Sequence, residues 1–93
     1  MVIMTLDFLT RPHVRGVLFE LMWGDRFESD LKTKTSSDTE FVEIRNRLLE
    51  DEIIYQFKGE NDALYLSLTD KGVALVNKLY EIERIIEGEE IDE

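Results

Sequence analysis

The chain has 93 residues, enough for one domain with a single modest core. Hydrophobic residues make up 43% of the sequence, which excludes a disordered chain, and the lack of cysteine excludes disulfides and thiolate metal sites. A formal net charge of −10 argues against a broadly basic surface for nucleic acid, and with one histidine we expect neither a metal nor a cofactor.

The first nine residues are apolar apart from Thr5 and Asp7. We expect this segment either to pack, as a short helix, on the last helix or on a partner subunit, or to cover the core of its own chain. It is too short to span a bilayer and lacks the basic lead-in of a secretion signal. We therefore expect a cytoplasmic protein without a membrane segment.

A first helix is predicted next, with Thr10 as its cap, Pro12 in its first turn and Gly24 after its end. Its apolar stripe has helical spacing and comprises Val14, Val17, Leu18, Leu21 and Met22. Trp23, at the end of this helix, is interpreted as a core or interface residue, with the wall of a ligand pocket as the alternative.

Residues 26–27 leave room only for a bend or a very short strand. Residues 28–34 predict a second helix of about two turns anchored by Leu31, and the polar residues 33–37 predict a turn. Two helices joined by a polar turn have the spacing of a helix-turn-helix, whose second helix enters a major groove.

The third helix is predicted to begin near Asp38, because Ser37 and Glu40 have the Ser-x-x-Glu spacing of a capping box. Its core-facing side comprises Phe41, Ile44 and Leu48. The opposite side is the one available to a DNA groove and comprises Thr39, Glu40, Glu43, Asn46, Arg47 and Glu50.

Two strands are predicted after this helix. Residues 53–57 are apolar, aromatic and β-branched, and residues 64–68 alternate with a period of two. Residues 58–62 between them are types that tolerate positive φ in a hairpin loop. The hairpin is therefore predicted to form a wing beside the third helix.

The order of these elements resembles the winged-helix transcriptional regulators of the MarR, PadR and HxlR type over residues 10–87. Residues 48–54 (LLEDEII) form the corner after the third helix, and residues 68–72 (LTDKG) lead into the last helix. The resemblance implies an α+β, mostly helical fold, a winged helix-turn-helix with a three-helix core, a two-stranded β-hairpin wing and a C-terminal dimerisation helix. It divides the chain into an N-terminal apolar segment (1–9), a winged helix-turn-helix domain (10–72), a dimerisation helix (73–87) and an acidic tail (88–93).

Within this pattern Thr69 is expected to cap the last helix, and Gly72 to let another element approach its first turn closely. Glu52 stands where the resembled regulators have glycine, so a left-handed helix end there would cost about 1 kcal/mol. Arg45 lies on the core-facing arc of the third helix, where we expect a salt-bridged or snorkelling side chain.

The resemblance implies a homodimeric, sequence-specific regulator that places its third helix in the major groove of double-stranded DNA. The outward side of that helix is acidic, and in the wing Lys58 is set against Glu60 and Asp62. Candidate DNA contacts are the neighbouring cations and polar side chains Arg26, Lys32, Lys34, Ser36, Ser37, Thr39, Asn46, Arg47 and Lys58. The alternative is an adaptor that binds a partner protein through its acidic face and does not bind DNA.

The last helix has two apolar strips. The first has coiled-coil spacing and is the predicted dimer interface, comprising Leu75, Leu79, Ile82 and Ile86. The adjacent strip comprises Val73, Val76 and Tyr80. One strip can pack on the first helix and the other on a second copy, which would place two third helices about 34 Å apart. Alternatively, both strips are buried within one chain.

No residue pattern selects a catalytic site. His13 has no cysteine or serine motif nearby and is interpreted as a surface residue, and no glycine-rich phosphate loop is present. We therefore expect no enzymatic activity. A small-molecule effector is compatible with the resemblance, but no residue pattern supports one.

Overall fold

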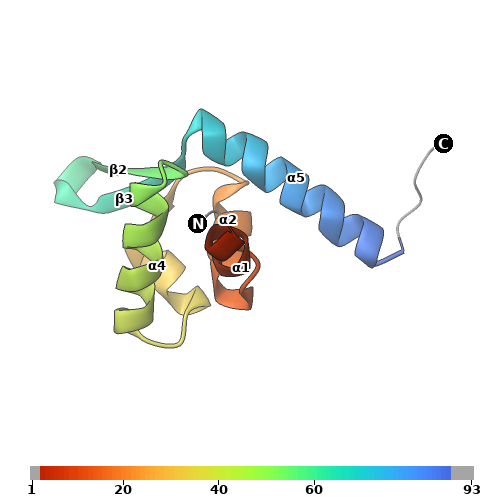
Figure 1. Cartoon of the computed structure of the whole chain (residues 1–93). Coiled ribbons are helices and arrows are strands. Elements are labelled where there is room, and N and C mark those ends of the chain that lie inside the picture. Colours follow the sequence, from red (N-terminus) through yellow and green to blue (C-terminus); the bar gives the residue numbers. More distant parts are fainter. Residues whose placement is uncertain (1–2, 89–93) are drawn as a thin grey trace.

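Five helices, two short 3₁₀ turns and three strands make up the part of the chain that the computed structural model describes, residues 3–88 (Figure 1). In chain order they are α1 (Ile3–Leu9), α2 (Pro12–Leu21), β1 (Arg26–Phe27), α3 (Glu28–Leu31), η1 (Lys32–Lys34), α4 (Asp38–Glu50), β2 (Ile54–Lys58), η2 (Glu60–Asp62), β3 (Leu64–Leu68) and α5 (Asp70–Ile86). The described chain measures 49 × 28 × 24 Å, and it is elongated because α5 projects from the body formed by the other helices and the sheet. None of the helices in the described range is both long and apolar enough to cross a membrane.

The predicted apolar stripes form one core. Its helical part comprises Val14, Val17, Leu18 and Leu21 of α2, Leu31 of α3, and Phe41, Ile44 and Leu48 of α4, all buried. Phe8 and Leu9 of α1 are 4% exposed and belong to the same cluster. Phe8 and Leu9 therefore cover the core of their own chain, whereas Leu6 is 61% exposed, so packing of this segment on a partner subunit stays a prediction; residues 1–2 lie outside the described range.

The three strands form an antiparallel sheet in the order β1-β3-β2. The two-residue strand at 26–27 and the hairpin are thus confirmed. Leu66 and Ile54 are buried on the face toward the helices. Asn61 and Asp62, at the tip of the wing, have φ of 61° and 60°, the positive values predicted for this loop.

The second predicted helix is present but divided. Its first four residues are α-helical (α3) and its last three form the 3₁₀ turn η1. A short polar segment tightens readily in this way, because few apolar contacts hold its last turn in α geometry.

One capping prediction was wrong and a second was right only in part. Thr10 does not cap α2: its hydroxyl donates to the carbonyls of Leu6 and Asp7, at 3.1 and 3.2 Å, so it satisfies the end of α1 instead. Ser37 does cap α4, accepting a hydrogen bond from the backbone N–H of Glu40 at 3.1 Å. The Glu40 carboxylate, however, accepts from Ser36 and not from Ser37, because Ser36 offers both its N–H and its hydroxyl, at 2.7 and 2.9 Å.

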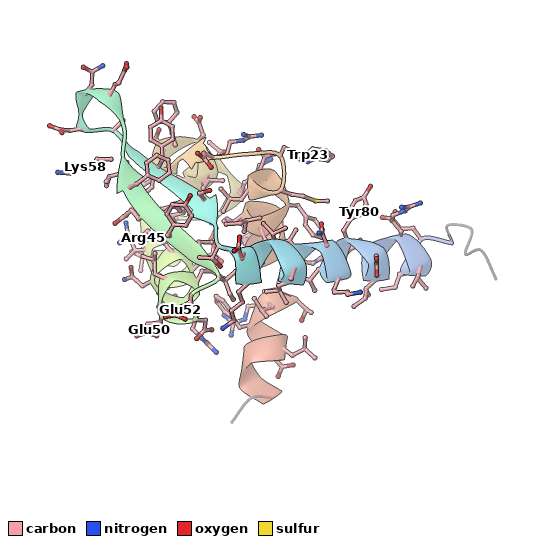
Figure 2. All side chains as sticks on the ribbon, turned by 90° about the horizontal axis from the view of Figure 1, so that it is seen from above. Trp23, Arg45, Glu50, Glu52, Lys58 and Tyr80 are labelled. Atoms are coloured by element: carbon pink, nitrogen blue, oxygen red, sulfur yellow. The ribbon has the colours of Figure 1, made fainter. Side chains whose placement is uncertain are left out.

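The corner after α4 has the left-handed helix end that is expected to cost free energy when its residue is not glycine. Glu52 has a left-handed φ of 61°. The N–H groups of Glu52 and Ile53 donate to the carbonyls of Leu49 and Leu48, both at 3.0 Å, which is the Schellman arrangement. Figure 2 shows Glu50 and Glu52 together at this end of the helix.

The start of α5 packs on that corner as predicted. Thr69 caps the helix by accepting from the N–H of Gly72 at 2.9 Å, and its hydroxyl also lies 2.6 Å from the carbonyl oxygen of Glu52. A Cβ at position 72 would lie 2.0 Å from the carbonyl oxygen of Ile53, so only glycine fits. The helix begins at Asp70, three residues before the segment assigned to it, because Thr69 is its N-cap.

The apolar residues of α5 are divided along the helix. Val76 and Leu79, in its middle, are buried in the core of the same chain, and Leu75 packs against that core. Ile82 and Ile86, farther along, are 52% and 75% exposed. The predicted four-residue seam is therefore half used within the chain and half available to another surface.

Candidate nucleic-acid interface

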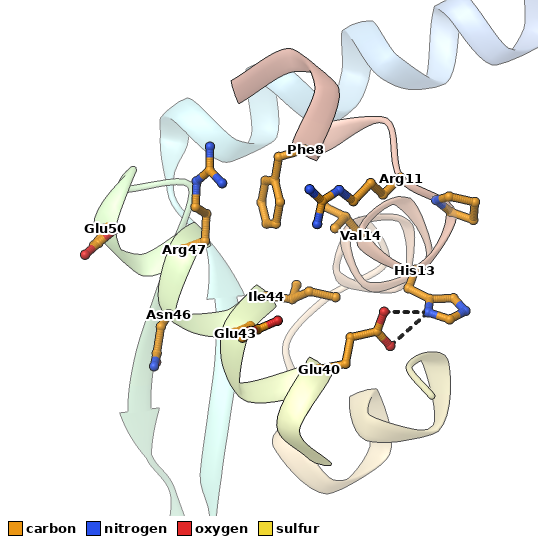
Figure 3. Close-up of a pocket in the computed structure, with 11 residues that line it drawn as sticks. Phe8, Arg11, His13, Val14, Glu40, Glu43, Ile44, Asn46, Arg47 and Glu50 are labelled. Carbon is orange, nitrogen blue, oxygen red and sulfur yellow. Dashed lines mark hydrogen bonds and ion pairs between the residues drawn. The ribbon is translucent and has the colours of Figure 1, made fainter. Parts of the chain in front are cut away.

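Four of the six side chains predicted to face outward from α4 are exposed, whereas Glu40 and Arg47 are turned toward His13 and Phe8. Thr39, Glu43, Asn46 and Glu50, which point away from the buried side, are all exposed. Figure 3 shows Asn46 and Glu50 directed away from α1 and α2. The third helix is thus accessible along part of the side that was predicted to face DNA.

A buried carboxylate fixes α4 against the wing and the preceding helix. Glu28 of α3 is 8% exposed, accepts from Arg45 of α4 at 3.1 Å and accepts from the amide of Gln56 in β2. The expected salt bridge of Arg45 is thereby confirmed. Sequence reasoning missed Glu28, whose partners are 17 and 28 residues away along the chain.

A groove of about 710 Å³ runs between α4 and the α1–α2 junction (Figure 3). Phe8 lies in it between two guanidinium groups, with the Arg47 carbon 4.5 Å and the Arg11 carbon 5.6 Å from the ring centroid. Trp23 does not line this groove. It is 71% exposed at the end of α2, so of the two roles predicted for it the core is wrong and the interface stays a prediction; its neighbour Met22 packs against the core.

Glu40 places a negative charge at the first turn of α4. Its carboxylate accepts from the backbone N–H and the hydroxyl of Ser36, and both of its oxygens lie 2.9 Å from Nδ1 of His13. The backbone hydrogen bond from Ser36, followed by that from His13, lowers the pKa of Glu40 from 4.5 to about 2. His13 is exposed, as expected, but it also joins α2 to the third helix (Figure 3).

Several predicted cations are neutralised within the chain. Arg26 and Lys34 both approach Glu20 of α2, with N–O distances of 3.3 and 3.5 Å. The hydrogen bond from Arg26, aided by Lys34, holds the pKa of the Glu20 carboxyl below its ordinary value, so this acid remains ionised beside both cations. Arg47 is turned toward Phe8 and away from the outward side of α4.

Two predicted cations remain exposed without an ion-pair partner in the described range. They are Lys32, at the start of η1, and Lys58, at the wing end of β2. Of the predicted polar contacts, Thr39 and Asn46 are exposed on α4, whereas the hydroxyls of Ser36 and Ser37 are engaged with Glu40. The oxygen of Asn46 accepts from Arg45 at 3.1 and 3.2 Å, which leaves its NH₂ group directed to solvent.

An exposed helix seated on a preceding helix and turn, with a β-hairpin beside it, defines a winged helix-turn-helix. The fold class expected from the sequence is therefore confirmed, and so is the resemblance to regulators of the MarR type, at the level of the fold.

No protein-family model matches the chain, and no curated protein matches it. Solved structures do match. A protein of Salmonella typhimurium described as a transcriptional regulator, ytfH, has a TM-score of 0.77 at 22% identity, over 89% of this chain and 78% of that one. A protein of Enterococcus faecalis V583 described as a MarR-family transcriptional regulator has a TM-score of 0.79 at 14% identity, over 92% and 82% of the two chains.

MepR, a transcription regulator of the Staphylococcus aureus multidrug efflux pump MepA, has a TM-score of 0.76 at 16% identity. The match covers 87% of this chain and 63% of MepR. All three are described as regulators of transcription.

Proposed function

We propose that the protein is a homodimeric, DNA-binding regulator of transcription that places α4 in the major groove. The observation that carries this proposal is the accessible outward side of α4, held in a winged helix-turn-helix that the chain shares with described regulators. Such a regulator acts on DNA, and we expect it to do so in the cytoplasm.

The proposal assigns different contacts to different groups. Lys32 and Lys58 are the exposed cations of the turn and the wing, and they contact phosphates. Thr39 and the NH₂ group of Asn46 contact base edges from the outward side of α4. Glu43 and Glu50 restrict binding to sequences and geometries that keep phosphates away from them, because like charges repel.

Two copies pair through the second half of α5. Ile82 and Ile86 are exposed and continue the apolar seam beyond the chain's own core. A two-fold pair would bring two α4 helices to successive major grooves of the same duplex.

The test is fluorescence anisotropy of labelled duplexes, first selected from random sequence, from low to physiological salt. A regulator should bind with affinity that falls steeply as salt rises, and Lys32→Glu or Lys58→Glu should lower the affinity by on the order of tenfold and flatten the salt dependence. Lys78→Glu makes the same change of charge on α5, where Lys78 is 77% exposed, and should have little effect.

A protein-binding adaptor is the second candidate. It is favoured by the neutralisation of Arg26, Lys34 and Arg45 by acids of the same chain. Absence of duplex binding at every salt concentration, for the full random pool, would establish it over the regulator.

A further inference from the structure

Four aromatic rings lie in a row on one face of the sheet. The strand register places Phe27, Tyr65 and Phe57 opposite one another on β1, β3 and β2, and Tyr55 lies two residues before Phe57 on the same face. Ring centroids are 4.4 Å apart for Phe27 and Tyr65, 5.1 Å for Tyr65 and Phe57, and 5.9 Å for Phe57 and Tyr55. We call these four residues the aromatic ladder.

The ladder lies on the face opposite the core. Alternation along the strands sends Leu66 and Ile54 to the other face, where they are buried against the helices. Phe27 and Tyr55, at the two ends of the ladder, are 40% and 48% exposed. These rings are not part of the core, and no helix in the described range covers them. They therefore form an apolar surface that is available to bind another molecule.

The ladder is also held in place. The Tyr65 ring lies where a Cβ of Gly59 would be, at 2.2 Å, so the glycine makes room for the central ring. Gly59 has a φ of −97°, which any residue adopts, so the space for the ring and not the backbone conformation requires glycine here.

The charges around the ladder are acidic. Glu52 and Asp70 line a surface hollow with Tyr55, together with Lys71. Lys58 follows Phe57 and so points to the other face, and Nζ of Lys71 donates to the carbonyl of Asp51 at 2.7 Å. Asp25 lies on the ladder's face, because it accepts from the hydroxyl of Ser67, the register partner of Tyr55.

Aromatic faces bordered by carboxylates match one kind of ligand chemistry. A guanidinium group stacks flat on an aromatic ring and at the same time donates to a carboxylate, whereas a phosphate backbone would be repelled by this border. We propose that the aromatic ladder docks an arginine-bearing basic segment of a partner protein, with arginines stacked on its two end rings, Tyr55 and Phe27. This surface is separate from the outward side of α4, so the proposal does not depend on DNA binding.

The experiment is a titration of the whole protein with a short peptide of alternating arginine and glycine, followed by NMR of the aromatic side chains. The resonances of Tyr55, Phe57 and Tyr65 should shift, with an affinity several-fold higher than for the lysine–glycine peptide of equal charge, because an ammonium group cannot stack. The glutamate–glycine peptide should not bind.

Matched variants separate stacking from general attraction to an acidic protein. Tyr55→Ser should lower the affinity by on the order of threefold, and Tyr55→Phe, which keeps the ring, should not. Asp70→Asn, at the hollow beside Tyr55, should weaken binding more than Glu87→Gln, although both remove one negative charge. Thermal unfolding of each variant checks that the sheet is intact.

Three outcomes would overturn the proposal. One is equal affinity for the arginine and lysine peptides with no loss in Tyr55→Ser, which would mean attraction by charge alone. Another is shifts confined to residues of α5. The third is displacement of the peptide by labelled oligothymidine that moves the same ring resonances, which would assign the ladder to single-stranded nucleic acid instead.

Discussion

Gly72 is the residue at which the α4 corner and α5 come closest. Replacing it with alanine would put a Cβ 2.0 Å from the carbonyl oxygen of Ile53 and force the first turn of α5 away from the corner. We expect Gly72→Ala to lower the free energy of unfolding by about 1–3 kcal/mol, the range for overpacking at a rigid contact, as measured by urea denaturation. Gly16→Ala is the control, because a Cβ there would make an ordinary contact of 3.7 Å with Lys34; it should stabilise α2 by about 0.5–1 kcal/mol. Equal effects of the two substitutions would contradict this account.

The ionisation of Glu40 makes the stability of the fold depend on pH in the acid range. Its folded-state pKa of about 2 lies below the ordinary value of 4.5, so the ionised carboxylate contributes stability that is fully present above pH 4.5 and is lost as the pH falls through about 2. The difference in unfolding free energy between wild type and Glu40→Gln should therefore be largest at neutral pH and vanish toward pH 2. Urea denaturation across this range measures it.

Ser36→Ala provides the control for that measurement. It removes the hydroxyl donor but keeps the backbone donor, which is the larger cause of the lowered pKa. The acid-dependent difference should become smaller but persist. If Glu40→Gln and wild type lose stability in parallel as the pH falls, the hydrogen bonds to Glu40 do not stabilise the fold.

Among the elements, the end of α4 stores strain that can be released. Glu52 is the left-handed residue of a Schellman end, where a side chain costs about 1 kcal/mol relative to glycine. Glu52→Gly should raise the free energy of unfolding by about that amount in urea denaturation. Glu52→Ala keeps the Cβ and removes the charge, so it should gain little. If both variants gain equally, the unfavourable charge at a helix C-terminus explains the effect, and the backbone does not.

Most element positions could be predicted from the sequence because they depend on local chemistry. The period of the apolar residues in α2 and α4, the Ser37 cap and the alternation of residues 64–68 are all properties of a few adjacent residues. Thr10 was misassigned because it lies between two helices, and its hydroxyl could serve either end.

The candidate site was less predictable, because it depends on contacts between distant residues. No local pattern shows that Glu28 is buried beneath Arg45 and Gln56, or that Glu20 neutralises Arg26 and Lys34 from another helix. Which of the cations remain exposed could be learned only from the fold.

At the scale of the whole molecule, the acidic charge and the elongated shape have separate consequences. The net charge of −10 keeps copies apart at long range, so pairing must depend on a compact apolar contact. The projecting part of α5 supplies one, since Ile82, Ile85 and Ile86 are all more than half exposed. An apolar helix end that projects into solvent is unfavourable in a monomer, whereas a dimer can bury it.

We expect wild type to sediment as a dimer at micromolar concentration and the double variant Ile82→Glu with Ile86→Glu to sediment as a monomer. Its helical content should be unchanged, because neither isoleucine belongs to the core. Leu79→Glu is the contrasting variant: Leu79 is 6% exposed within its own chain, so a charge there should unfold the protein and not merely separate the copies. A wild-type monomer, or a double variant that remains a dimer, would remove α5 from the interface and with it the proposed spacing of the two α4 helices.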